Sequence, residues 1–230
     1  MSAASEPRES ALLSLGINIA IPAFILMKLS GEEHLGPVAG LVAALAFPLA
    51  YGAWDFHRRR EWNFVSVIGF VSVLLTGGIG LLQLDPKWIA VKEAAVPAVI
   101  GLAVLLSIYT RRPIVRMFLY NDKIIRVAEV DAALAERGNH GAFDRTLVNA
   151  SWMLAGSFFL SSLLNFVLAT LIVRSPAGTT AFNEELGRMT ALSYPVIVIP
   201  SMAIMIAALW YLFQRIRRLT GMDLEQILKS

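Results

Sequence analysis

The chain has 230 residues, of which 57% are hydrophobic and only 16% are charged, and its mean hydropathy is +0.64. Soluble domains carry about 25% charged residues, so this composition excludes a cytosolic enzyme, a nucleic-acid-binding module and a disordered chain. The absence of cysteine excludes disulfide bonds, thiolate nucleophiles and cysteine-ligated metals.

Six apolar runs follow one another, each near the roughly 17–25 residues that a helix needs to cross about 30 Å of hydrocarbon. We expect a helix from each run, because lipid offers the backbone no hydrogen-bond partner and no run alternates as a barrel strand does. The first run lacks an Ala-x-Ala cleavage site, which favours a retained helix over a signal peptide. The predicted spans are 11–28, 38–56, 63–84, 94–110, 146–173 and 190–214.

The lysines and arginines divide unequally between the two sides of these spans. Fifteen of the 20 lie in the N-terminal tail, in the loops after spans two and four, or after the end of span six. Because cytoplasmic loops carry the excess of positive charge, both termini are predicted in the cytoplasm, and the net charge of +3 reflects orientation. The predicted fold class is all-α: a tail 1–10, a single six-helix transmembrane domain 11–220, and a tail 221–230.

The predicted outer loops are 29–37, 85–93 and 174–189, and the last is expected to be irregular because it contains Pro176 and Gly178. Only the cytoplasmic loop between spans four and five has room for structure of its own. Asn121-Asp122 can cap a short amphipathic helix that runs to Glu136-Arg137 and stops at Gly138. This helix either connects the spans while lying on the bundle or headgroups, or binds a partner.

Polar residues inside the predicted spans are candidates for function, because a side chain that hydrogen-bonds in lipid must face a partner, a cavity or water. They form hydrogen bonds between helices or line a substrate path. Prolines such as Pro97 either kink the helices or help to build a transport site. Gly36-x-x-x-Gly40 favours close helix packing within the bundle. The polar candidates are Asn18, Asn149, Asn165 and Ser161.

No catalytic constellation is present in the sequence. The three histidines fall in different loops, and neither a Gly-x-Ser-x-Gly nor a His-Glu-x-x-His pattern occurs. We therefore expect no enzyme activity, no metal and no cofactor. The cytoplasmic arginines either contact anionic lipid headgroups or partners, or only set the topology. These candidate contact residues are Arg58, Arg59, Arg60, Arg111, Arg112, Pro113 and Arg116.

Several motifs lie at the junction of spans three and four, within and after span four, inside span one and at the opening of span five. They are Thr76-Gly77-Gly78, Asp85, Ile89-x-x-Lys92, Gly101-Leu102-Ala103, Arg112-Pro113-Ile114, Asn18-x-x-x-Pro22 and Leu147-x-Asn149-x-x-Trp152. Over about residues 11–220, this pattern resembles the intracellular septation protein A family of bacterial inner-membrane proteins and its septation-like relatives. The outer-face part of the motif comprises Asp85, Trp88, Ile89 and Lys92.

The resemblance implies a non-enzymatic protein of the bacterial inner membrane that contributes to envelope integrity or cell division through interactions with proteins and lipids. The alternative is a lipid or small-solute transporter with a polar path between kinked helices. The expected partners are membrane lipids, including anionic headgroups, and envelope or division proteins, and no nucleic acid is expected.

Overall fold

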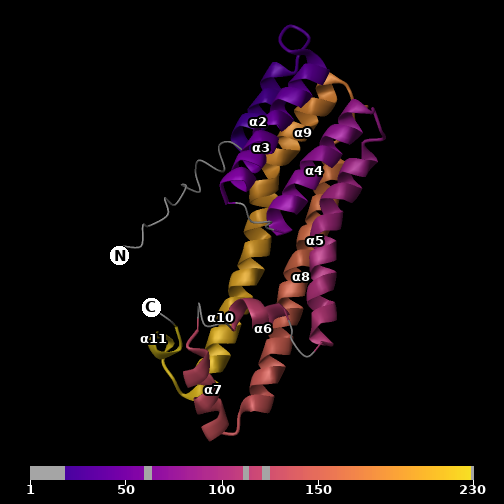
Figure 1. Cartoon of the computed structure of the whole chain (residues 1–230). Coiled ribbons are helices and arrows are strands. Elements are labelled where there is room, and N and C mark those ends of the chain that lie inside the picture. The colour runs from indigo at the N-terminus through magenta and orange to yellow at the C-terminus, as the bar shows by residue number, and fades with distance from the viewer. Residues whose placement is uncertain (1–18, 60–63, 111–113, 121–124, 229–230) are drawn as a thin grey trace, which may run out of the picture. The chain divides into compact units, whose positions relative to one another are not determined.

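A computed structural model describes residues 19–59, 64–110, 114–120 and 125–228 (Figure 1). In this part of the chain an isolated antiparallel bridge, Ile125 to Leu228, is the only extended pairing, and the rest is helices and short connections. The elements are α2 (Ile21–Phe24), η2 (Ile25–Leu29, a π-helix), α3 (Gly36–Arg59), α4 (Phe64–Leu81), α5 (Lys87–Ile108), α6 (Ile114–Leu119), α7 (Val127–Glu136), α8 (His140–Ile172), α9 (Thr180–Ser193), η3 (Tyr194–Val198, a π-helix), α10 (Ile199–Thr220) and α11 (Leu224–Ile227).

Four helical segments are long and apolar enough to cross a membrane, which indicates a membrane protein. They are Gly36–Trp54, Lys87–Ile108, His140–Ile172 and Thr180–Thr220. The predicted all-helical fold is therefore confirmed for the described residues, and these four segments are candidate spans that correspond to four of the six predicted ones. The third predicted span forms α4, whose apolar part, Val67–Leu81, is shorter. Most of the first predicted span lies outside the described residues.

The contacts divide the chain into two compact units, which are described separately. Unit 1 comprises Met1–Glu93 and Asn165–Tyr194, and unit 2 comprises Ala94–Leu164 and Pro195–Ser230. The helices α5 and α8 contribute residues to both units.

In unit 1, α9 packs against α2, η2 and α3, and the close crossings are made at small residues (Figure 1). Gly187 of α9 lies against the backbone of Ala23, and Gly40 of α3 lies against Ser30. Asn183 is fully buried, and its Nδ2 donates to the carbonyl of Pro37 over 2.6 Å. Gly40 and Gly187 thus allow close approach inside this unit, whereas a Cβ at Gly36, the other glycine of the predicted motif, would meet no atom within 4 Å.

Replacing Gly40 with alanine is expected to destabilise the protein by roughly 1–3 kcal/mol, the usual cost of overpacking. A Cβ at this position would lie 2.9 Å from the Cα of Ser30, a residue that is itself buried and bonded through its carbonyl to Thr180. Gly52→Ala in the same helix meets no atom within 4 Å and should be neutral or mildly stabilising. Melting temperatures in detergent compare the two variants, and equal shifts would contradict this packing.

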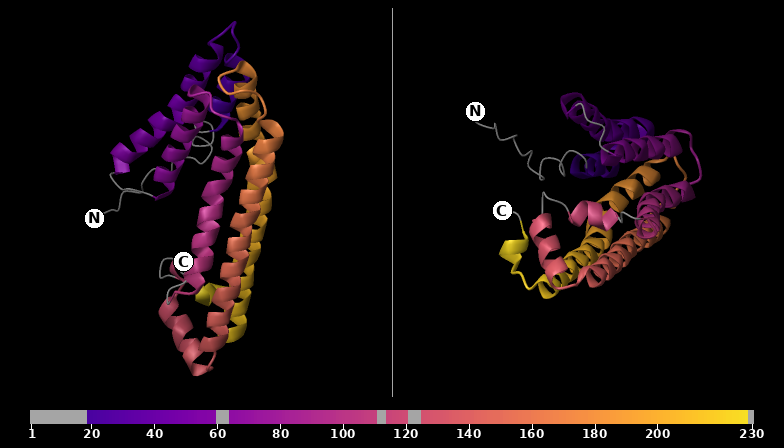
Figure 2. Two further views of the ribbon diagram at one scale, coloured as in Figure 1. Left: turned by 90° about the vertical axis from the view of Figure 1, so that its right-hand side faces the viewer. Right: turned by 60° about the horizontal axis from the view of Figure 1, so that its bottom comes forward.

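In unit 2, α8 and α10 form an antiparallel pair, with the second part of α5 along α8 (Figure 2). Ser157 of α8 donates to the carbonyl of Ser201 over 2.7 Å, and Ser162 donates to the carbonyl of Ala94 over 2.8 Å. Gly101 of α5 lets that helix approach Phe158. Small and hydroxyl residues therefore hold these helices together, as is usual for helices in lipid.

Two of the predicted outer loops contain more helix than expected. The prediction that 174–189 is irregular is wrong from Thr180 onward, because α9 begins there. Thr179 caps α9 by accepting from the N–H of Phe182, and Phe182, Leu186 and Met189 form its buried face. The loop 85–93 is also shorter than predicted, because α5 begins at Lys87, directly after Pro86.

The connection between α5 and α8 contains the predicted amphipathic helix, which begins at Val127. The predicted cap, Asn121-Asp122, lies outside the described residues. The N-cap of this helix is Arg126, and its buried residues are Val130 and Leu134. Gly138 ends it as predicted: its φ is +64°, and Asn139 N–H then donates to the Leu134 carbonyl over 2.9 Å. The short helix α6 precedes it and has no counterpart in the sequence prediction.

Candidate functional site

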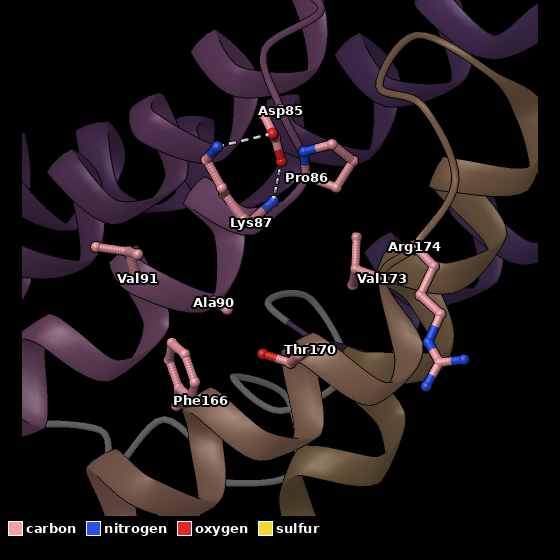
Figure 3. A pocket seen from close by; sticks show the side chains of 9 residues that line it. All are labelled: Asp85, Pro86, Lys87, Ala90, Val91, Phe166, Thr170, Val173 and Arg174. Carbon is pink, nitrogen blue, oxygen red and sulfur yellow. Dashed lines mark hydrogen bonds and ion pairs between the residues drawn. The ribbon is translucent and has the colours of Figure 1, made fainter.

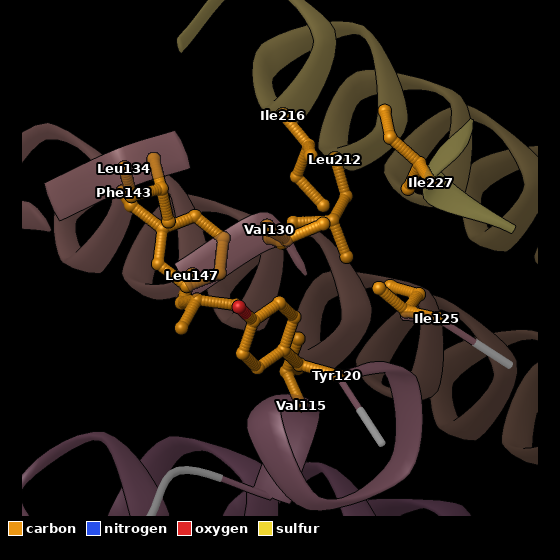
Figure 4. Close-up of a cluster of buried hydrophobic side chains, with 11 residues drawn as sticks. Val115, Tyr120, Ile125, Val130, Leu134, Phe143, Leu147, Leu212, Ile216 and Ile227 are labelled. Atoms are coloured by element: carbon orange, nitrogen blue, oxygen red, sulfur yellow. The ribbon is translucent and has the colours of Figure 1, made fainter. Parts of the chain in front are cut away.

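The best-packed part of unit 2 is formed by α6, α7, α11 and the adjoining ends of α8 and α10, which we call the terminal module (Figure 4). Amphipathic α7 buries Val130 and Leu134 against the start of α8 and the end of α10, and α11 closes the other side with Ile227. Its buried core consists of Val115, Tyr120, Ile125, Val130, Leu134, Phe143, Leu147, Ala150, Leu212, Ile216 and Ile227. Residues 221–230, predicted as a tail, thus include a helix that is part of this core.

Polar contacts fix the segments of the terminal module to one another. Asn139 Nδ2 donates to the carbonyl of Leu219 over 2.8 Å, so the turn between α7 and α8 is tied to α10. Arg126 N–H donates to the carbonyl of Ile227 over 2.9 Å and ties α11 to the start of α7. Asp223 caps α11 in a capping box with Gln226. The module is therefore held by side chains and backbone from four separate stretches of sequence.

Among the candidate contact arginines of the sequence prediction, Arg116 is the one whose side chain the structure describes. Its guanidinium lies 5.9 Å from the centre of the Tyr120 ring and 3.9 Å from Asp144. Tyr120 in turn donates to Asp131 over 2.7 Å and packs on Phe143. Of the other predicted contact residues, Arg60, Arg111, Arg112 and Pro113 lie outside the described residues, and the side chains of Arg58 and Arg59 are not described.

The outer surface of the terminal module carries charges of both signs, because Glu129, Glu136, Asp144, Asp223 and Glu225 are exposed alongside its arginines. Arg137, Arg145 and Arg218 are exposed, and Arg126 and Arg217 are half-exposed beside Glu129 and Asp223. The sequence prediction placed positive charge here for topology but singled out none of these five arginines. The fold gathers them because α7, α8 and α10 end around one core.

An exposed aromatic belt borders the terminal module. Tyr109 is 84% exposed, Trp210 66% and Trp152 54%. Asn149 Nδ2 donates to the Tyr211 hydroxyl over 3.1 Å, so Trp210 and Trp152 lie within about one helical turn of the same height. Gly101 of α5 contacts Phe158 of α8, and the two helices run antiparallel. Tyr109, eight residues after Gly101, therefore lies at about the height of Asn149 and Trp152. Such belts mark the boundary between hydrocarbon and headgroups.

The helix lengths agree with this boundary. The 22 residues of α5 span about 33 Å, close to the thickness of the hydrocarbon, and exposed Trp88 and Tyr109 flank them. The 33 residues of α8 span about 50 Å, so this helix extends well beyond the hydrocarbon. We therefore expect the terminal module to lie at the level of headgroups and water.

The intramembrane polar candidates do not converge on one site. Asn149 bonds to Tyr211 at the aromatic belt. Asn165 and Ser161 are half-buried in α8 and neither is without an interaction partner. Asn18 lies outside the described residues. Ser162, which the sequence did not single out, bonds the carbonyl of Ala94, in the turn that Pro97 disturbs because proline has no N–H.

The four residues of the outer-face motif take different roles in unit 1. Asp85 accepts from the backbone N–H of Lys87 and pairs with its ammonium, both over 2.9 Å, and these bonds lower the pKa of Asp85 below its ordinary value. Trp88 is half-exposed, whereas Ile89 is fully buried. The sequence prediction of Lys92 as a loop residue is wrong, because it lies inside α5.

Lys92 forms a buried charged site with Glu93 and Ser72. Its side chain is only 6% exposed. Its ammonium donates to the Glu93 carboxylate over 2.6 Å and to the Ser72 hydroxyl over 3.1 Å, so the site joins α5 to α4. Within the described residues this arrangement satisfies the buried charge, which would otherwise be costly in lipid.

Within the part of the chain that the structure describes, no three His, Asp or Glu side chains are grouped so as to hold a metal ion. Comparison with family models, with curated proteins and with solved structures finds no match for this chain.

Proposed function

We propose that the chain is a bacterial inner-membrane protein that crosses the membrane six times. It acts without catalysis, through protein and lipid interactions that maintain the cell envelope or support division. The observation that carries this proposal is the terminal module, which has a closed apolar core and exposed arginines at fixed positions and is bordered by the aromatic belt. The septation-like motifs support the same conclusion.

The chemistry of the terminal module suits a membrane-proximal contact surface. Basic residues next to an anionic leaflet are worth about 1 kcal/mol each, and the exposed arginines supply such charges. A folded core fixes where these arginines stand, so they can also recognise acidic groups on a partner protein. The distribution of lysine and arginine predicts the cytoplasmic side for this surface.

Neutralising two exposed arginines of the module tests the proposal. Arg145→Gln with Arg218→Gln removes two charges from the surface without touching the core. In cells that lack the protein, we expect changed cell length or envelope sensitivity, which the wild-type chain corrects and this double variant does not. Lys28→Gln with Arg188→Gln removes two exposed charges from unit 1 and should correct the defect fully. An unchanged phenotype on deletion, or correction by both variants, refutes the proposal.

Crosslinking identifies the partner in the same cells. A photoreactive residue at Ala132, which is exposed on α7, should capture envelope or division proteins, whereas one at Glu184, which is exposed on α9, should not. The same set of adducts from both positions speaks against a specific contact surface.

A transporter is the second candidate, and the observation in its favour is the buried Lys92. Charged groups inside membrane helices mark substrate and ion paths. Against it, the hydroxyl groups of Ser157 and Ser162 donate to backbone carbonyls of neighbouring helices, so these bonds join helices and do not line a polar path. Loss of solute uptake in Lys92→Met, with normal correction of cell shape, would favour the transporter.

A further inference from the structure

Unit 1 contains a pocket of about 440 Å³ between the start of α5 and the end of α8 (Figure 3). Its walls are mostly apolar: Val91 comes from α5, and Phe166 extends from α8 toward that helix. Three charged residues, Asp85, Lys87 and Arg174, lie at its rim. A volume in this range and an apolar wall with a few polar groups are typical of ligand sites.

The pocket lies where a lipid headgroup meets its acyl chains. Exposed Trp88 adjoins Lys87 on the first turn of α5, and tryptophan in this setting marks the headgroup level. Arg174 follows directly after the end of α8. Val91 and Phe166 lie further along the two helices and are each nearly half exposed. The charges thus stand at the membrane boundary and the apolar wall extends into the hydrocarbon.

The charges at the rim favour an anion. Lys87 and Asp85 neutralise each other as an ion pair. The guanidinium of Arg174 has no ion-pair partner among the residues that the structure describes, so the rim carries one net positive charge. Glu185 fixes the backbone beside Arg174, because its carboxylate accepts from the N–H groups of Arg174 and Ser175, both over 2.8 Å. These bonds fix the turn from which the exposed Arg174 side chain extends, and a guanidinium can bind a phosphate group with two parallel hydrogen bonds.

We infer that this pocket binds one anionic phospholipid, with the headgroup phosphate on Arg174 and an acyl chain along Val91 and Phe166. The site lies in unit 1 and uses none of the terminal module, so it goes beyond the proposed function and stands or falls separately from it. It gives the protein a defined lipid ligand rather than general contact with the bilayer.

Native mass spectrometry of the purified full-length chain with added phosphatidylglycerol or phosphatidylethanolamine tests the inference. We expect one retained phosphatidylglycerol per chain and at least about tenfold weaker retention in Arg174→Gln, since the charged hydrogen bonds to phosphate are lost. Val91→Trp should also weaken retention, because the indole occupies the space along the apolar wall. Val91 is nearly half exposed, so the larger side chain should not disturb the fold. Arg188→Gln, an exposed arginine outside the pocket, should retain the lipid as the wild-type chain does.

Other results would overturn the inference. Equal retention of phosphatidylethanolamine removes the preference for an anionic lipid. Loss in Arg174→Gln with full retention in Val91→Trp, or displacement of the lipid by soluble glycerol phosphate, identifies a surface anion site instead. An equal loss in Arg188→Gln means that net charge alone attracts the lipid.

Discussion

Val130→Asp is expected to unfold the terminal module while the membrane helices remain inserted. Val130 is completely buried between α7 and the ends of α8 and α10, and no cation lies within the apolar core that surrounds it. Burying an unpaired carboxylate there should cost at least about 4 kcal/mol, which puts it among the most damaging kinds of single substitution. Trypsin digestion of the chain in nanodiscs measures the effect, because unfolding exposes the bonds after Arg126 and Arg137.

Ala132→Asp is the matched control, since it introduces the same charge two residues away on the exposed side of α7. It should remain as resistant to trypsin as the wild-type chain. The smaller change Val130→Ala should give partial sensitivity, because it leaves a cavity without burying a charge. Equal resistance of Val130→Asp and Ala132→Asp would show that this core does not hold the module together.

Hydropathy predicts most of the long helices, because each apolar run is a local property of the sequence. The same approach missed α9, whose buried side is formed by Phe182, Leu186 and Met189 at helical spacing. These residues are interleaved with Asn183, Glu184 and Glu185, which lower the mean hydropathy, and the prediction of an irregular loop relied on Pro176 and Gly178. The spacing and the cap at Thr179 could have revealed the helix.

The terminal module could not be predicted from local pattern. Ile125, Phe143, Ile216 and Ile227 are each fully or almost fully buried, but they come from four stretches of sequence that only the fold brings together. The pocket of unit 1 likewise joins α5 to the end of α8, nearly 80 residues later. Sequence periodicity gives the face of one helix and does not give its partner.

Lys92→Met is expected to destabilise unit 1 much more than Lys87→Met, although both remove a lysine that pairs with a carboxylate on or beside α5. The ammonium of Lys92 is buried and holds Glu93 and Ser72, whereas Lys87 and Asp85 are mostly exposed. Removing one member of a buried pair costs roughly 3–5 kcal/mol. The value here should lie near the lower limit, because the Glu93 side chain is 27% exposed and water can partly solvate it.

The double variant Lys92→Met with Glu93→Gln should recover most of the loss, because it removes both charges and leaves neither buried without a partner. Unfolding in detergent with increasing denaturant measures these three variants and Glu93→Gln alone. A small loss in Lys92→Met, equal to that of Lys87→Met, would mean that the ammonium reaches water and is not held between α4 and α5. If the double variant loses as much unfolding free energy as the two single variants together, Lys92 and Glu93 act independently. Their close contact then contributes nothing to joining α4 and α5.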